Sequence, residues 1–425
     1  MNGAGEKVCV VTLGCARNVV DSEKALGDLL RAGARRQPLA RASTVVLNTC
    51  GFTEEAKRES LEAIEDLVRR KRSGKIRALY VSGCLVERYR RQLSADFPDV
   101  DGWQGVAAFP SKGITPAAAR LTGASSAFLK IAEGCANLCT YCAIPMIKGA
   151  LRSRPQADIL REARALDRQG VKEINIIGQD ITLYGLTRPG RPDALPLVRL
   201  LRRMLAQTRF PWIRLLYLHP ARVSDDLIDL IAGEPRLCSY ADIPFQHVHP
   251  RILRAMGRRT RGQEIPALVE KLRRRIPGVA LRTSFIVGFP GETKREFGAL
   301  CNAVTALRFD RMGVFAYSRE EGTAAYRLPG QRSRRVKEER RDHLMRLQEG
   351  ISAENLRRDV GRSLEVLIEA PGRGKSAFLG RSYKDAPEVD GVVHVRSRRR
   401  LAVGSLVRCR VTSSSAHDLY AEPLE

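Results

Sequence analysis

Three cysteines stand within eight positions of the sequence, in the run EGCANLCTYCAIP at residues 133–145. A structural zinc site needs four ligands, but the next histidine after Cys142 is His219. A redox pair would use Cys139 and Cys142 and leave Cys135 without a role. Three thiolates can instead hold three irons of a cubane iron–sulfur cluster and leave the fourth iron open to a substrate. The C-x3-C-x2-C spacing therefore favours an iron–sulfur site with these three cysteines as ligands.

Three more cysteines closely follow predicted strands near the N-terminus. Cys15 follows the predicted strand KVCVVTL (7–13), Cys50 follows TVVLN (44–48) and Cys84 follows RALYVS (77–82). Parallel strands end at one edge of their sheet, so we predict a second three-thiolate site at that edge. The alternative is three buried core thiols, which would lie within strands, as Cys9 does. Cys9, Cys238, Cys301 and Cys409 belong to no ligand cluster, and we assign them to packing.

The elements around these cysteines predict an α/β protein of three domains. Strands and helices (18–32, 53–72 and from about 85) alternate in residues 5–120, which is typical of an open parallel sheet. A segment rich in Pro, Gly and Ala at about 105–125 indicates a linker.

Six strands separated by helices predict a partial βα barrel in residues 121–355, with its site at the carboxyl ends of the strands. We expect the strands at 127–132, 173–177, 213–218, 240–244, 281–287 and 311–316. Helices are expected between them, for example at 156–170 and 262–278. A charged helix at about 333–358 leads into residues 357–425, where alternating patterns separated by Gly, Pro and Asp predict a small all-β barrel.

Composition limits the cellular setting. The chain has 425 residues, of which 44% are hydrophobic and 28% charged, the balance of a globular protein. It has no apolar run long enough for a membrane helix and no signal-peptide pattern. We therefore expect a cytoplasmic protein with no membrane partner and with reduced thiols, which argues against disulfides. The formal net charge of +26 is compatible with a polyanionic partner. A solvated basic surface without a dedicated partner is equally compatible, because the arginines are scattered through the chain.

The cysteine run resembles the radical S-adenosylmethionine (SAM) superfamily. The resemblance rests on C-x3-C-x2-C, on the aromatic Tyr141 before the last cysteine, and on the six βα units. It implies that Cys135, Cys139 and Cys142 bind a [4Fe–4S] cluster whose open iron binds SAM.

The whole chain resembles the methylthiotransferase family of that superfamily. Members combine an N-terminal three-cysteine domain, a radical barrel and a C-terminal TRAM domain. The resemblance implies a second [4Fe–4S] cluster on Cys15, Cys50 and Cys84, and an electron donor such as flavodoxin or ferredoxin. One departure is Ala136, which stands where the family commonly has Asn.

Two stretches resemble the branch that modifies a ribosomal protein, namely KIAEGC (130–135) and GRSYKDAPEVDG (380–391). That branch adds a methylthio group to the β-carbon of an aspartate in the twelfth protein of the small ribosomal subunit. The partner would then be this protein or the ribosomal subunit. A tRNA adenosine methylthiotransferase is the alternative, and a zinc-containing RNA-binding protein is the non-enzymatic one.

Weaker signals suggest further contacts. Gln179 and Asp180, in INIIGQDITLYG, follow a strand where substrate or adenosyl contacts could lie, and a simple helix cap by Asp180 is equally compatible. Gly288 and Gly291 lie in the turn IVGFPGET, whose backbone could approach a cofactor. Gln246 and His247 end another strand, where a hydrogen-bonded role is favoured over a metal ligand. Six arginines between residues 396 and 410 suggest a docking face for rRNA or a ribosomal surface.

Overall fold

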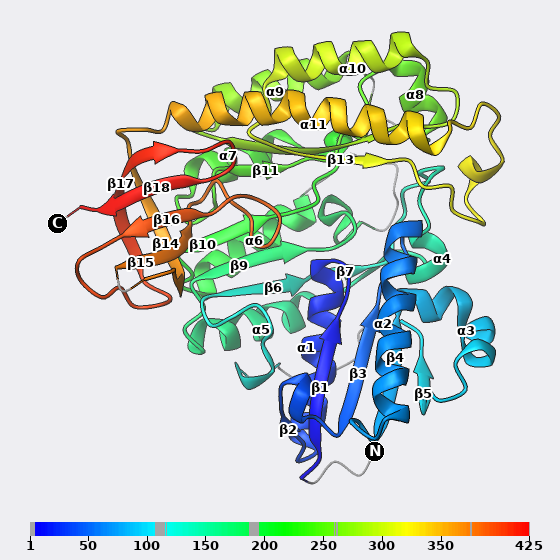
Figure 1. Cartoon of the computed structure of the whole chain (residues 1–425). Helices are drawn as coiled ribbons and strands as arrows, with labels where there is room; N and C mark the ends of the chain where they lie inside the picture. Colours follow the sequence, from blue (N-terminus) through cyan, green and yellow to red (C-terminus); the bar gives the residue numbers. More distant parts are fainter. Residues whose placement is uncertain are drawn as a thin grey trace.

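The computed structural model describes residues 5–106, 115, 117–186, 195–258, 260, 262–374 and 376–424. Figure 1 shows an N-terminal α/β domain, a central domain of strands and covering helices, and a C-terminal β-barrel. Among the described residues, no helix combines the length and the apolar character needed to cross a bilayer. The predicted α/β architecture with a small β-barrel is confirmed.

The N-terminal domain contains a five-stranded parallel sheet rather than three strands alone. Its order is β2 (Arg35–Arg36), β1 (Lys7–Thr12), β3 (Thr44–Thr49), β4 (Ala78–Gly83), β5 (Gly102–Gln104). The two edge strands have two and three residues, which is too short to give a periodic signal. All six residues of β3 are buried, as its apolar sequence predicts.

Strand β1 differs from the expectation that it is buried on both faces, because only Val8 is fully buried. The edge strand β2 pairs only with Lys7 and Val8, so the rest of β1 lies uncovered on that side.

Helices cover both faces of this sheet. They are α1 (Ala16–Arg31), α2 (Glu54–Arg72) and α3 (Cys84–Asp96), with a 3-10 turn η1 (Leu39–Arg41). Val8 packs with Leu26 of α1 on one face. On the other face Leu47 and Leu79 pack with Ile64 of α2. Residues 107–114 and 116 of the predicted linker lie outside the described residues, and 117–119 form the turn η2 (Ala117–Ala119).

The central domain is an open barrel made from two three-stranded parallel sheets. One has the order β10 (Trp212–Leu215), β9 (Glu173–Ile177), β6 (Ser126–Lys130), and the other β11 (Tyr240–Asp242), β12 (Ala280–Val287), β13 (Arg311–Ala316). A parallel pairing of Ile213 with Leu237 links them. The six predicted strands are present, but the third ends at Leu215 rather than 218. Tyr217, with a left-handed φ of 63°, turns the chain out of the strand there.

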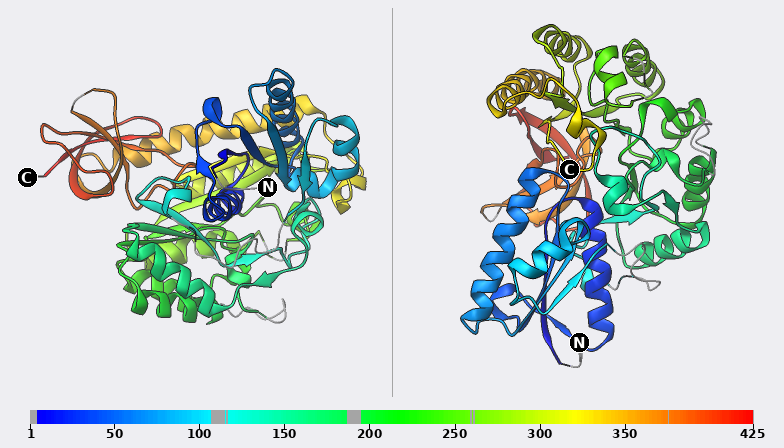
Figure 2. Two further views of the ribbon diagram at one scale, coloured as in Figure 1. Left: turned by 90° about the horizontal axis from the view of Figure 1, so that it is seen from below. Right: turned by 90° about the vertical axis from the view of Figure 1, so that its right-hand side faces the viewer.

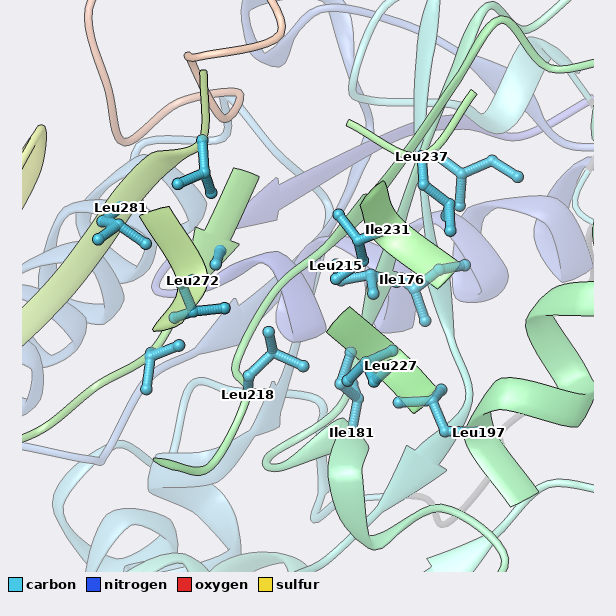
Figure 3. Packing of buried hydrophobic residues seen from close by; sticks show 14 of the residues in the cluster. Ile176, Ile181, Leu197, Leu215, Leu218, Leu227, Ile231, Leu237, Leu272 and Leu281 are labelled. Carbon is cyan, nitrogen blue, oxygen red and sulfur yellow. The ribbon is translucent and has the colours of Figure 1, made fainter. Parts of the chain in front are cut away.

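Helices surround this barrel and bury its core. They are α5 (Gln156–Arg168), α6 (Leu195–Gln207), α7 (Asp225–Gly233), α8 (Pro250–Ala255), α9 (Glu264–Arg275) and α10 (Lys294–Leu307). Three 3-10 turns, η3 (Ile181–Leu183), η4 (Pro220–Arg222) and η5 (Ala324–Arg327), complete the connections. Figure 3 shows Leu197, Leu215 and Leu227 from different elements converging in this core.

The C-terminal part begins with the long helix α11 (Arg334–Arg357), which packs along β13. A closed five-stranded barrel follows, in the order β14 (Ser363–Pro371), β15 (Ala377–Arg381), β16 (Val393–Arg396), β18 (Leu419–Pro423), β17 (Leu406–Ser414). Figure 2 shows it beside the central domain, at one end of the molecule.

The segment 380–391 fixes this small barrel to the starts of the central strands. The buried Arg381 pairs with Glu173, the first residue of β9. In the same segment Asp385 pairs with Arg311, the first residue of β13. The C-terminal barrel is therefore held at the end of the central sheets opposite to their carboxyl ends.

Candidate iron–sulfur sites

The N-terminal cysteines lie where their strands give way to helices. Cys15 is the N-cap of α1, Cys50 directly follows β3, and Cys84 is the first residue of α3. Their thiols are close enough to affect each other: burial, with the charges of Cys50 and Cys15, raises the pKa of Cys84 to about 12. The structure therefore brings Cys15, Cys50 and Cys84 together at the carboxyl edge of the sheet.

Gly14 makes room for this grouping. Its φ is +90°, which favours glycine. A Cβ at this position would lie 3.0 Å from the Cys50 Sγ and 2.8 Å from the Cys50 Cβ. A larger residue would therefore displace the second thiol of the set.

Cys15 differs from its two neighbours because its thiolate form is stabilised. Burial raises the pKa of the Cys15 thiol, but the Arg17 guanidinium and the backbone N–H groups of Asn18 and Arg17 outweigh burial and lower it. Cys15 also remains partly exposed, whereas Cys50 and Cys84 are buried.

The second set lies in the loop that follows β6. A short hairpin, β7 (Ala132–Glu133) with β8 (Arg152–Ser153), forms its base, and α4 (Ile144–Lys148) follows the last cysteine. The Cys135 N–H donates to the Gly149 carbonyl at 3.3 Å, and the Cys142 N–H to the Cys139 carbonyl at 3.1 Å. Burial, with the charges of Cys139 and Cys135, raises the pKa of Cys142 to about 12. These three thiols are thus also neighbours.

The donor set fits iron–sulfur clusters. All ten cysteines are free thiols. Among the described residues, no three His, Cys, Asp or Glu side chains converge closely enough to ligate one metal ion. A zinc site requires that convergence because its ligands share one ion, whereas in a cubane cluster each thiolate binds a different iron.

Arg17 connects the two sets. It neighbours Cys15, and its charge also acts on Cys142, lowering the pKa that burial raises. Its Nη1 donates to the Gly178 carbonyl at 2.9 Å, directly after β9, and its guanidinium lies 4.6 Å from the centre of the Tyr217 ring. The carboxyl edge of the N-terminal sheet therefore faces the carboxyl ends of the barrel strands. In Figure 1 the arrows of β1 and β6 point toward this junction.

A buried ion network joins the domains beside the thiols. Lys130 pairs with Asp21 of α1 and with Glu133, and Lys148 lies 3.1 Å from Asp21 and 3.5 Å from Glu133. The Gln179 Nε2 donates to the Glu133 Oε1 at 3.0 Å, while the buried Gln179 Oε1 has no partner among the described residues. Gln179 therefore lies at the junction with an acceptor available, and its contact with the cofactor stays a prediction.

A second polar cluster holds the cysteine loop, and Asp180 is its one member that the sequence indicated. Asn137 donates through Nδ2 to Asp180 at 2.7 Å, and Arg222 donates to the Asn137 Oδ1 at 2.8 Å and to Asp180. Asp180 also accepts from the Thr182 N–H at 3.0 Å, so it caps η3 and anchors the loop at once. Arg222 carries no motif; only the fold brings it to the loop.

Other predicted positions are explained locally. The Gly288 N–H donates to Glu292 within the turn, and a Cβ on Gly288 would lie 2.5 Å from the Lys337 Cγ. Gly291 donates to the Gly330 carbonyl at 2.9 Å. Their contact with a cofactor remains a prediction. His247 is buried, which lowers its pKa to about 3, and its Nδ1 accepts from the His249 N–H at 2.9 Å.

Comparison with known proteins agrees with this arrangement. Residues 7–105 match an uncharacterized protein family, UPF0004, residues 129–304 match the radical SAM superfamily, and residues 360–424 match the TRAM domain. Among solved structures, the radical SAM methyltransferase TsrM from Kitasatospora setae has a TM-score of 0.52 at 16% identity over 73% of each chain. The cobalamin-dependent SAM radical enzyme OxsB has a TM-score of 0.51 at 12% identity, covering 82% of this chain and 56% of OxsB. These two likenesses concern the fold alone.

Curated relatives match over nearly the full length. The ribosomal protein uS12 methylthiotransferase RimO of Geobacter sulfurreducens is 43% identical over 99% of both chains. That of Geotalea uraniireducens is 44% identical over 98% of both chains. Superfamily membership implies SAM and a [4Fe–4S] cluster as cofactors. The chain belongs to the RimO family of radical SAM methylthiotransferases.

Proposed function

We propose that this enzyme adds a methylthio group to the β-carbon of an aspartate in ribosomal protein uS12. The observation that carries the proposal is the meeting of two three-thiol sets at one domain junction, spanned by Arg17. The full-length identity to relatives named for uS12 supports the choice of substrate. Because ribosomes work in the cytoplasm, we expect the enzyme to act there.

Each set has its own task. Cys135, Cys139 and Cys142 would hold a [4Fe–4S] cluster that binds SAM, and a second cluster would be bound by the N-terminal cysteines Cys15, Cys50 and Cys84. When bound, these groups supply a radical able to remove hydrogen from an unactivated carbon, and the sulfur that replaces it. A radical is needed because a β C–H bond is too weakly acidic for any side chain to deprotonate.

The chain's own residues prepare and hold the ligands. Arg17 and the N–H groups at the start of α1 favour the thiolate of Cys15, which is the form that binds iron. Asn137, Asp180 and Arg222 anchor the loop that carries the barrel cysteines. The network around Asp21 fixes α1 against β6 and so sets the two thiol groups face to face.

An electron donor such as flavodoxin or ferredoxin would reduce the barrel cluster. The C-terminal barrel would dock the ribosomal substrate through an rRNA contact. A cavity of about 780 Å³ on it is lined by Arg373, Arg396, His394 and Tyr420. The His394 ring stacks on Tyr420 at 4.9 Å, and Tyr420 is 40% exposed. Aromatic platforms among arginines are typical of surfaces that bind single-stranded RNA.

Two measurements test the proposal. Protein purified anaerobically should be brown and contain about eight irons with matching sulfide, because two cubane clusters hold four irons each. A colourless protein loaded with zinc would contradict the radical chemistry.

The substrate is tested by mass spectrometry. Reconstituted enzyme with SAM and a chemical reductant should increase the mass of uS12 by a methylthio group in place of hydrogen. Isolated uS12, small ribosomal subunits and tRNA are compared in parallel. Modification of tRNA alone would show that the enzyme acts on an adenosine instead.

A further inference from the structure

The junction between the thiol sets holds an arginine that forms no ion pair with any carboxylate of the described residues. Arg17 contacts a carbonyl at Gly178, the face of Tyr217 and the Cys15 thiol. It takes part in none of the ion pairs found among the described residues, and it is only partly buried. A guanidinium carries five N–H donors, so these contacts leave donors available to a ligand.

Three other cations of the junction already pair with carboxylates. Lys130 and Lys148 share the carboxylates of Asp21 and Glu133. Arg222 pairs with Asp180. Glu133 also acts on Arg17 from a distance, but its two oxygens are committed to the lysines and to Gln179. The charge of Arg17 is thus available in the place where the two sets face each other.

We propose, on the basis of the proposed function, that Arg17 binds the side-chain carboxylate of the substrate aspartate and thereby selects this residue type. Arginine suits this role because its planar fork matches a carboxylate with two parallel hydrogen bonds. The β-carbon is bonded directly to the carboxyl carbon, so fixing the carboxylate also fixes the β C–H bond. The Tyr217 ring packs against one face of the guanidinium, and the Gly178 carbonyl accepts a hydrogen bond at one edge. These two contacts orient the remaining N–H donors.

Arg258 is the other arginine near the thiols that could bind the substrate carboxylate. Its Nη1 lies 3.8 Å from the Cys139 Sγ and its Nη2 donates to the Pro244 carbonyl. It lies beside the barrel set alone and does not reach the N-terminal thiols in any contact found among the described residues. A group that must be presented to both sets is better held by Arg17.

The test is a double-mutant cycle measured as binding. Peptides of uS12 that contain the modified position, with aspartate or asparagine there, are titrated into holoenzyme saturated with SAM and kept without reductant. Wild type should bind the aspartate peptide about tenfold or more tightly than the asparagine peptide, since a charge-assisted pair is lost. Arg17→Gln should bind both peptides equally, and Arg17→Lys should retain part of the preference.

Controls separate this role from a structural one. Arg31→Gln, at the far end of the same helix and paired with Asp28, should keep the full preference. Iron content and circular dichroism confirm that each variant is folded and loaded. An undiminished preference in Arg17→Gln, or a preference abolished by Arg258→Gln and not by Arg17→Gln, would overturn the proposal.

Failure of the proposed function looks different. In that case wild-type enzyme with reductant would leave uS12 unmodified and would bind neither peptide. If wild type modifies uS12 but binds the two peptides equally, the function stands and the assignment of Arg17 is wrong.

Discussion

Thiols of the same chemical type are placed in different environments at this junction. The pKa of Cys15 is lowered by Arg17 despite burial, while burial raises those of Cys84 and Cys142 to about 12. A raised pKa disfavours the thiolate, and a metal that binds thiolate reverses this by taking the place of the proton. The buried cysteines are therefore unreactive as free thiols and suited to a cluster.

The division of labour between the thiol sets gives a prediction for single cysteines. Cys50→Ala should reduce the iron content from about eight to about four per chain. It should abolish methylthio transfer while leaving reductive cleavage of SAM within about twofold. Cys139→Ala should abolish both activities. Iron analysis and chromatography of 5′-deoxyadenosine provide the measurements, with Cys301→Ala as the unaffected control. Loss of SAM cleavage in a folded Cys50→Ala protein would contradict separate roles.

At the level of elements, the strand ends and helix starts determine where the cysteines point. Helix α1 starts directly after Cys15, and α3 starts at Cys84 itself. Gly14 lets the chain turn from β1 into α1 with a φ of +90° and leaves space for the Cys50 thiol. The turn between these elements is thus as much a part of the site as the thiols are.

Gly14→Ala should therefore deplete the N-terminal cluster. The added Cβ would lie 3.0 Å from the Cys50 Sγ, which must shift, and we expect iron to fall to about four per chain. Gly74→Ala is the matched control, because Gly74 also has a positive φ, of +74°, but nothing lies within 4 Å of the added atom. It should cost about 1 kcal/mol of backbone strain and keep all its iron. A full iron complement in Gly14→Ala would refute the steric argument.

At the level of the whole molecule, buried charges attach both outer domains to the barrel. Asp21 ties α1 to the mouth of the barrel, and Arg381 ties the C-terminal barrel to Glu173 at the opposite end. Buried pairs of this kind add little net stability, yet they cost much when one partner is removed. They therefore define how the domains are oriented.

Asp21→Asn should loosen the N-terminal domain. The buried Lys130 would lose one of its two partners, and Lys148 would lose one as well. We expect a loss of about 3 kcal/mol in the free energy of unfolding, with faster hydrogen exchange in α1 and β6. Asp28→Asn, on the same helix in an exposed pair with Arg31, should change stability by less than about 1 kcal/mol. Equal effects of the two substitutions would contradict a role for the network in docking.

Glu173 should make the attachment of the C-terminal barrel sensitive to acid. Burial raises its pKa, but Arg381 and Arg214 outweigh burial and lower it to about 2 from an ordinary value of 4.5. The stabilisation is therefore complete above pH 4.5 and is lost as the pH falls toward 2, an effect of about 3 kcal/mol. Urea unfolding of wild type and Glu173→Gln in the same buffers measures it.

Glu173→Gln should be less stable than wild type by about 3–5 kcal/mol at neutral pH, because the buried Arg381 and Arg214 lose a charged partner. The difference should shrink below pH 4.5, and the loss of iron in acid, common to both proteins, cancels in the comparison. Glu55→Gln, an exposed position on α2, is the control. A difference that is constant with pH would exclude the pairing as its cause.

The amino-acid sequence alone predicted most of the strands and helices and pointed to two groups of three cysteines, whose binding of iron–sulfur clusters stays a prediction. Alternating strands and helices predicted the parallel arrangement of the N-terminal sheet and of the central strands. Because parallel strands place their ends at one edge, Cys15, Cys50 and Cys84 could be grouped from their positions after the predicted strands. These signals are local, because each depends on a strand and the few residues that follow it.

The surroundings of the thiols depend on tertiary packing. Arg17 meets Gly178 across 161 positions, Arg222 meets Asn137 across 85, and Arg381 meets Glu173 across 208. A lone arginine has no periodicity or spacing to distinguish it from the many others of this basic chain. The packing of helices and sheets decides which residue such an arginine contacts. For this reason the roles of Arg17 and Arg222 became visible only in the tertiary structure.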